Sequence, residues 1–171
     1  MRVGLFGIGN VLMGDDAFGP TVIARIGALW SLPENVTLAD LGTPSLDLAA
    51  RLSDLDAAIF IDAVSASASP GTLLRYTRPE LLEHPPGLRL SPHEPSLKET
   101  LLTLEFIGEG PQTVVLIGIV PERLDGFGMS DVVEAAVPQA AEMAIAELAR
   151  LDVQATLRSC PLDDTPWWRA A

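Results

Sequence analysis

Cysteine is almost absent from this chain of 171 residues, in which Cys160 is the single example. One thiol excludes an internal disulfide, and it also excludes a zinc cluster built on several cysteines. Chains that fold without disulfides are typical of reducing compartments. We therefore expect a cytoplasmic protein.

Basic residues and long apolar runs are also scarce. Eleven Lys and Arg residues stand against 23 Asp and Glu residues, which gives a formal net charge of −12. Nucleic acid and anionic membranes bind basic patches, so neither is an expected partner. No apolar run approaches the ~20 residues that a membrane-spanning helix needs, and the first residues lack a signal-peptide cleavage pattern.

Apolar residues make up 48% of the chain and fall into short segments that predict a sheet. Segments rich in Val, Ile and Leu predict strands at 2–7, 36–41, 57–64 and 113–120, with a weaker edge strand at 71–77. Helical patterns occur at 19–30, 45–53, 96–106 and 130–150. The alternation of strands and helices predicts an α/β fold, a three-layer sandwich with a largely parallel sheet.

Two helices carry signals for where they begin. Ser96 and Glu99, in "SLKE", have the spacing of a capping box at the start of the third helix. Pro138 falls inside the fourth helical pattern, where a proline fits only the first turn of a helix. We therefore expect a short helical turn from Ser130, followed by a longer helix with Pro138 near its start.

Two segments have no clear period. Residues 78–95 contain several prolines and predict a long surface loop. The tail from about residue 152 ends in "DDTPWWRAA" and is expected to lie over or off the domain, with Trp167 and Trp168 docked on an apolar patch. The expected organisation is one domain at 1–152 and a C-terminal tail at 153–171.

Polar side chains fall at the predicted carboxyl ends of strands, where ligands gather in open α/β sheets. Asp15 and Asp16 follow the first strand, Asp40 lies near the end of the second, and Asp62 lies near the end of the third. His93 precedes the predicted third helix. Carboxylates with an imidazole suit zinc, nickel or manganese, and paired carboxylates can also share a proton and activate water. A lone Asp at a strand end is more typical of a turn or cap.

The stretch "GIGN" at residues 7–10 raises a nucleotide-binding alternative, because its G-x-G follows a predicted strand. However, Leu12 occupies the third glycine position of G-x-G-x-x-G. Asp15 and Asp16 would place negative charge where a pyrophosphate should bind. The nucleotide-binding module therefore stays the weaker alternative.

Four segments, in order over about residues 1–150, resemble the hydrogenase maturation endopeptidases. They are "GIGNVLMGDDAFGP", "DLGTPSLDL", "FIDAV", and "SPHEPSLKETL" followed by "VVLIGIVPERLDGFGMS". Members of that family cut a C-terminal extension from the large subunit of nickel–iron hydrogenases. The resemblance implies a twisted, mostly parallel five-stranded sheet flanked by helices.

The resemblance also implies roles for individual residues. The family's metal-contacting acid in G-N-x-L-x-x-D-[DE] falls on Asp16, its second carboxylate on Asp62, and its histidine on His93. These three are thought to contact nickel already inserted in the substrate, so no permanent cofactor is expected. "GT" at Gly42–Thr43 matches a loop near the site. Asp15 is then expected to cap or brace the following turn.

The function that the resemblance implies is hydrolysis of one peptide bond in a nickel-loaded hydrogenase large-subunit precursor. The nickel would position and polarise the scissile carbonyl while a carboxylate activates water. We expect a monomer. Two alternatives are a nickel-holding chaperone without catalysis and a peptidase of the same fold acting on another protein. Ala17 departs from the pattern, since many relatives have Gly there.

Overall fold

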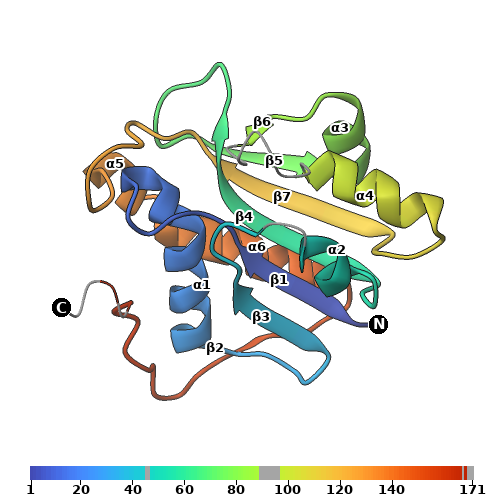
Figure 1. Ribbon diagram of the computed structural model, residues 1–171. Coiled ribbons are helices and arrows are strands. Elements are labelled where there is room, and N and C mark those ends of the chain that lie inside the picture. Colours follow the sequence, from blue (N-terminus) through green and yellow to red (C-terminus); the bar gives the residue numbers. More distant parts are fainter. Residues whose placement is uncertain (45–46, 89–96, 167, 169–171) are drawn as a thin grey trace.

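The computed structural model describes residues 1–44, 47–88, 97–166 and 168, and it places a sheet between two layers of helices (Figure 1). Within these residues, five strands form the main path of the sheet, in the order β3-β1-β4-β7-β5. Their bounds are β1 Val3–Gly7, β3 Val36–Asp40, β4 Ala57–Ser65, β5 Leu73–Thr77 and β7 Thr113–Ile119.

Four of these strands are parallel, and their carboxyl ends meet at one edge of the sheet. Gly7 of β1 is level with Asp40 of β3 and Ile61 of β4. Asp62, the next residue of β4, is level with Gly118 of β7. β5 alone runs antiparallel, at the outer edge beside β7. The predicted mostly parallel five-stranded sheet, with 71–77 at its edge, is confirmed.

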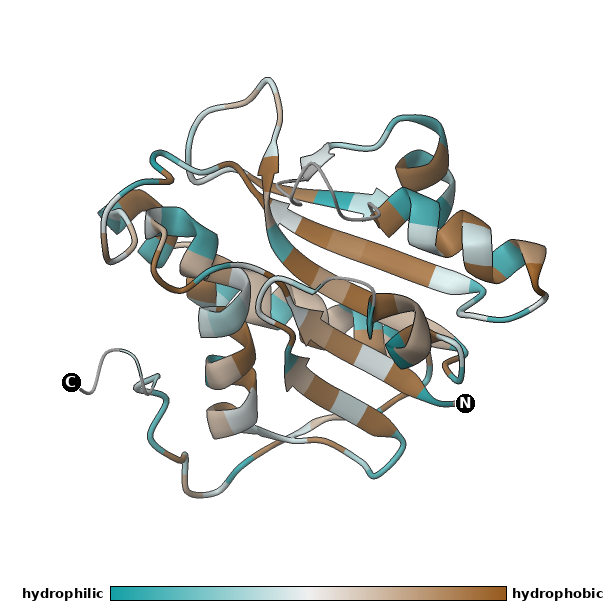
Figure 2. Cartoon of the chain, in the orientation of Figure 1, coloured by the Kyte–Doolittle hydropathy of each residue, from teal (hydrophilic) through white to brown (hydrophobic). Residues whose placement is uncertain are grey.

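The helices cover both faces of the sheet. α1 (Phe18–Leu29) and α6 (Val137–Arg150) pack on one face, and α2 (Asp47–Leu52), α3 (Arg78–Glu83) and α4 (Leu97–Phe106) pack on the other. Alternate residues of β4 serve the two cores: Ile59 and Ile61 join the first, and Phe60 and Val64 join the second. Figure 2 shows β7 hydrophobic over most of its length, as expected for a strand covered on both sides.

The predicted helices agree with the structure wherever it describes them. Pro138 lies in the first turn of α6, and the short α5 (Asp131–Glu134) precedes that helix, as the proline predicted. Residues 45–46 of the second predicted helix and the predicted cap Ser96 lie outside the described residues. In the part of the chain that the structure describes, no helix is both long and apolar enough to cross a membrane.

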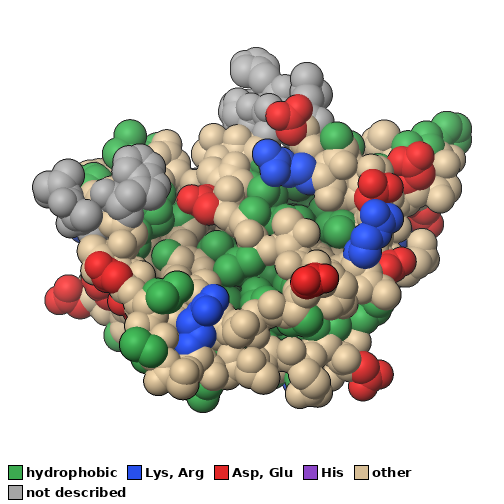
Figure 3. Space-filling view, turned by 90° about the horizontal axis from the view of Figure 1, so that it is seen from below, with side chains coloured by type: hydrophobic (Ala, Val, Ile, Leu, Met, Phe, Trp, Pro, Cys, Tyr) green, Lys and Arg blue, Asp and Glu red, His purple; other side chains and the backbone are tan. Residues whose placement is uncertain are grey.

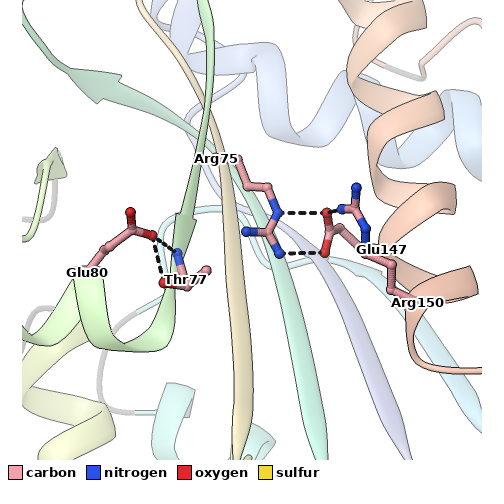
Figure 4. Close-up of polar contacts among 5 residues, drawn as sticks. All are labelled: Arg75, Thr77, Glu80, Glu147 and Arg150. Carbon is pink, nitrogen blue, oxygen red and sulfur yellow. Dashed lines mark hydrogen bonds and ion pairs between the residues drawn. The ribbon is translucent and has the colours of Figure 1, made fainter.

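The prediction of a loop over 78–95 is wrong for its first part, which forms α3 and the short strand β6 (Gly87–Leu88). The Glu80 carboxylate accepts hydrogen bonds from the Thr77 backbone N–H (2.7 Å) and hydroxyl (2.6 Å), which completes a capping box (Figure 4). Pro79 lies in the first turn, where it needs no hydrogen-bond partner. A proline that indicated a loop therefore marks the start of a helix.

The C-terminal tail lies along α1 rather than off the domain. β8 (Thr156–Leu157) pairs antiparallel with β2 (Trp30–Ser31), and the Leu162 N–H donates to the Ala28 carbonyl. Trp168 is half buried beside a hollow between the tail and α1, whereas Trp167 lies outside the described residues.

Seen from below, the molecule has a face on which hydrophobic side chains gather near the middle, with charged side chains around them (Figure 3).

One buried carboxylate joins the antiparallel edge strand to the opposite helix. Glu147 of α6, whose side chain is 6% exposed, accepts two hydrogen bonds from the Arg75 guanidinium of β5, at 2.8 and 2.9 Å. It also accepts a hydrogen bond from Arg150 one turn later (Figure 4). Burial alone would raise the pKa of Glu147, but its bonds to Arg75 and the charge of Arg150 hold that pKa below its ordinary value.

Arg75→Ala should lower the free energy of unfolding by about 1–2 kcal/mol, because it removes both bonds of a bidentate pair. The expected loss of stability is modest because more than a third of the Arg75 side chain is exposed to solvent. Urea unfolding measures the change. Arg2→Ala is the matched control, because the Arg2–Asp54 pair is exposed on both sides and 3.6 Å apart. Equal losses in the two variants would show that the buried pair adds nothing particular.

Candidate active site at the carboxyl edge of the sheet

The turn after β1 folds back tightly on itself at Gly9. This residue has φ +142°, and a Cβ there would lie 1.8 Å from the Asp16 carbonyl oxygen. The Gly9 N–H donates to the Gly42 carbonyl at 2.8 Å, which joins the turn to the loop after β3. The glycine of "GIGN" therefore makes room for the chain's own backbone, which argues against the nucleotide-binding alternative.

Asp16 lies in a short 3-10 helix (Gly14–Ala17) between β1 and α1. Its carboxylate accepts a hydrogen bond from the Asn10 N–H at 2.8 Å, and its own N–H donates to the Met13 carbonyl at 3.0 Å. The residue is 8% exposed. Hydrogen bonds across the turn therefore fix the position of Asp16, the residue on which the family's metal-contacting acid falls.

Asp15 faces a different environment, although it is the adjacent residue. It is fully buried, and its carboxylate accepts hydrogen bonds from the backbone N–H groups of Glu122, Arg123 and Ser130 and from the Ser130 hydroxyl, at 2.6–3.0 Å. Burial alone would raise the pKa of Asp15, but these donors together hold that pKa below its ordinary value. Asp15 therefore braces the loop after β7, whereas we expected it to cap or brace the turn that directly follows it.

The loop over 121–130 lies within a segment that carries the family resemblance, but no role in the site was predicted for it. Backbone bonds join it to the turn after β1, from Gly14 N–H to the Gly126 carbonyl (2.8 Å) and from Asp15 N–H to the Arg123 carbonyl (3.0 Å). The Arg123 guanidinium donates to the carbonyls of Asp125 and Gly128. The two backbone bonds to the turn after β1 span more than a hundred residues, and no local pattern indicates them.

Asp62 supplies the second carboxylate, near the end of the central strand β4. It is 4% exposed, and its Oδ1 accepts a hydrogen bond from the Ala63 N–H at 2.7 Å. Burial, followed by the negative charge of Asp16, raises the pKa of Asp62 well above its ordinary value. The structure therefore places Asp16 close enough to Asp62 for its charge to raise the pKa of Asp62, an arrangement suited to acid–base chemistry.

Asp40 closes a turn at the same edge of the sheet. Its Oδ1 accepts a hydrogen bond from the Gly42 N–H at 2.8 Å, and Gly42 has φ +59°. Because Gly42 in turn accepts from Gly9, the "GT" loop lies beside the turn after β1, as expected from the motif. Asp40 is exposed, and its observed bond is that of a turn residue.

The two histidines fall in different situations. His93 lies outside the described residues, whereas His84 is exposed at the end of α3. Over the described ranges alone, no three His, Cys, Asp or Glu side chains are arranged to hold a metal ion. Of the three predicted ligands, the structure therefore describes Asp16 and Asp62. The contact of all three with a metal stays a prediction.

A hollow of about 340 Å³ lies between the end of β4 and the loop after β7. One wall is the end of β4 over residues 63–66, which directly follows Asp62. The other wall is residues 120–124, including the Glu122 and Arg123 whose N–H groups bind Asp15. The hollow therefore lies beside the residue that follows Asp62 and beside the segment that binds Asp15.

Comparisons with known proteins converge on one family. A family model described as hydrogenase maturation protease matches residues 20–147. The hydrogenase 2 maturation protease of Escherichia coli (strain K12) is 33% identical over 163 residues, which cover 92% of this chain and 97% of that protein. The hydrogenase expression/formation protein HupD of Rhodobacter capsulatus is 34% identical over 149 residues, covering 87% and 70%.

Solved structures give the same result. The hydrogenase maturating endopeptidase HybD from E. coli superposes with a TM-score of 0.83 at 33% identity, covering 93% of this chain and 99% of that one. The hydrogenase 2 maturation peptidase from Thaumarchaeota archaeon SCGC_AB-539-E09 gives a TM-score of 0.67 at 33% identity, covering 87% and 99%. The similarity thus includes the whole sheet and both helical layers.

Asp15→Asn should lower the free energy of unfolding by about 1–3 kcal/mol, because an amide cannot accept hydrogen bonds with both of its heavy atoms. The lowered pKa of Asp15 means that its contribution is present above the ordinary Asp range and is lost as the pH falls through the folded-state pKa. Urea unfolding at neutral pH measures the loss. Asp54→Asn, at an 82% exposed carboxylate, should change little, and an equal effect there would contradict the bracing role.

Asp62→Asn should leave the fold as stable as the wild type or make it more stable at neutral pH. The raised pKa means that the folded chain holds a proton the unfolded chain has released, so wild-type stability falls as pH rises from about 4 to the folded-state pKa. The stability of the variant does not fall in this way, because Asn carries no titrating carboxyl group. Its advantage should grow by about 1.4 kcal/mol per pH unit within that window. Unfolding curves that stay parallel across the window would refute the raised pKa.

Proposed function

The chain belongs to the hydrogenase maturation protease family, and on this basis we propose that it cuts the C-terminal extension from a nickel-loaded hydrogenase large-subunit precursor. The observation that carries the proposal is the pairing of Asp16 and Asp62 at the carboxyl edge of the sheet. Both are buried to more than nine-tenths, and a hollow begins at Ala63, the residue that follows Asp62.

The proposed reaction is hydrolysis of one peptide bond near the substrate's nickel. The nickel belongs to the precursor, where it positions and polarises the scissile carbonyl. One carboxylate accepts a proton from the attacking water, and a proton-bearing carboxyl group can protonate the leaving amine. Asp62 suits the proton-bearing role in the free chain because burial and the charge of Asp16 raise its pKa. The enzyme holds no permanent cofactor of its own in this proposal.

His93 is the proposed third group at the nickel. Support comes from the first described residue that follows it in the chain: Leu97 is 1% exposed and packs in the same core as Phe60 and Val64. Alternation along β4 places Asp62 on that same face of the sheet, between those two residues. A neutral imidazole complements two carboxylates as a ligand for a divalent first-row metal such as nickel.

Further parts of the proposal concern the setting in which the enzyme acts. A monomer working in the cytoplasm fits a chain with one exposed thiol, Cys160, and a strongly acidic composition. The domain at 1–152 would carry the chemistry. The tail at 153–171 would cover α1, where the Leu162 N–H already bonds to the helix.

The test is a processing assay on nickel-loaded precursor, with cleavage read as a mass loss. His93→Ala should lower kcat/KM by at least about a hundredfold, because it removes a group that acts at the reacting atoms. Asp16→Asn should abolish cleavage without lowering the melting temperature. His84→Ala is the matched control and should cut at the wild-type rate, since His84 is exposed at the end of α3.

Two outcomes would contradict the proposal. Precursor bound by the wild-type chain without any mass loss would indicate a nickel-holding chaperone. Full activity in His93→Ala would remove that residue from the site. Cleavage of an unrelated protein in place of the hydrogenase precursor would instead indicate a peptidase of the same fold with another substrate.

A further inference from the structure

Three large apolar side chains are exposed at the tips of the two loops that frame the site. Leu12 and Met13, in the turn after β1, are 64% and 42% exposed, and Phe127, in the loop after β7, is 61% exposed. Figure 1 shows both loops at the same end of the sheet. We call these three residues the apolar rim.

The apolar rim is held in place from below. The Gly14 N–H donates to the Gly126 carbonyl at 2.8 Å, which joins the residue after Met13 to the residue before Phe127. Val11 and Leu124 pack against the core beneath the two loops. The backbone on either side of the rim is therefore fixed by the loop contacts that also hold Asp15. Neighbouring apolar side chains held exposed in this way are typical of a binding surface.

Acidic groups border the apolar rim. Glu122, Asp125 and Asp131 are exposed on the same loop and on the start of α5. Arg123, the basic residue among them, directs its guanidinium to backbone carbonyls of its own loop. An apolar centre with a charged border is the usual anatomy of a protein interface, and here the border is negative.

We propose that the apolar rim docks the folded body of the precursor, through an apolar patch that basic side chains surround. This inference rests on the proposed function, because a precursor whose cleaved bond reaches Asp16 must also cover Met13, three residues earlier in the same turn. Docking at the rim supplies affinity for the folded precursor, while the carboxylate pair carries out the cleavage. Substitutions in the rim therefore weaken binding and leave the chemical step intact.

The experiment compares Phe127→Ser with Phe127→Leu in the processing assay, measuring KM and kcat separately. Phe127→Ser should raise KM about tenfold, as expected for an exposed aromatic that becomes an anchor in an interface. The value of kcat and the melting temperature should stay at the wild-type level. Phe127→Leu should restore most of the affinity because it keeps an apolar side chain of similar reach.

Phe106→Ser is the matched control, because Phe106 is 91% exposed at the end of α4, next to the loop that leads into the amino end of β7. It should leave KM unchanged. An unchanged KM in Phe127→Ser, an equal rise in Phe106→Ser, or a loss confined to kcat would each overturn the docking role. A dimer of the chain alone that Phe127→Ser abolishes would assign the rim to self-association and would also overturn it.

A second readout separates this inference from the proposed function. Affinity for the precursor is measured in the Asp62→Asn background, in which the precursor should be bound but not cut. If the wild-type chain fails to cut the precursor but binds it, the proposed function fails, and the affinities of the Phe127 variants still test the rim. If cleavage occurs and these affinities equal that of the background, the rim inference alone fails.

Discussion

The buried carboxylate of Asp15 is the contact on which the rest of the site depends. It gathers three backbone N–H groups and one hydroxyl from a loop that lies more than a hundred residues further along the chain. A buried charge is stable only when its hydrogen bonds are complete, and these donors complete them. The bond network fixes the turn that carries Asp16, one wall of the hollow, and the start of α5 at Ser130.

Two buried acids of the site, Asp15 and Asp62, thus acquire opposite duties from their surroundings. Asp15 is surrounded by donors and keeps its negative charge, with a lowered pKa. Asp62 is buried and lies near the charge of Asp16, so its pKa is raised. The same side-chain chemistry therefore provides a structural brace at one position and a proton-holding group at another. Hydrogen-bond donors outweigh burial at Asp15, whereas burial and the charge of Asp16 prevail at Asp62.

Much of this arrangement follows from local patterns in the sequence. Apolar runs predicted the strands, and strand–helix alternation placed Asp16 and Asp62 at one edge of a parallel sheet. Local patterns misjudged α3, because Pro79 indicates a loop until the bond between Thr77 and Glu80 is known. They also missed β8 and the loop over 121–130. Both depend on pairing between distant segments, which no periodicity records.

The glycines of the first turn show the same limit in another form. A G-x-G after a strand is compatible with a phosphate-binding loop and with a tight turn of the backbone on itself. A Cβ at position 9 would clash with the Asp16 carbonyl oxygen, which decides for the tight turn. This close approach is a property of the fold. The turn at "GIGN" was therefore predictable, whereas the reason for a glycine at position 9 required the structure.

The most direct test of the account is the pKa of Asp62, measured by carboxyl ¹³C NMR in the wild-type chain and in Asp16→Asn. We expect a raised pKa in the wild type, because Asp62 is buried beside the charge of Asp16. In Asp16→Asn the pKa of Asp62 should be lower, because that charge is removed. An ordinary Asp pKa in the wild type, or a value that Asp16→Asn does not change, would contradict the pairing of the two carboxylates.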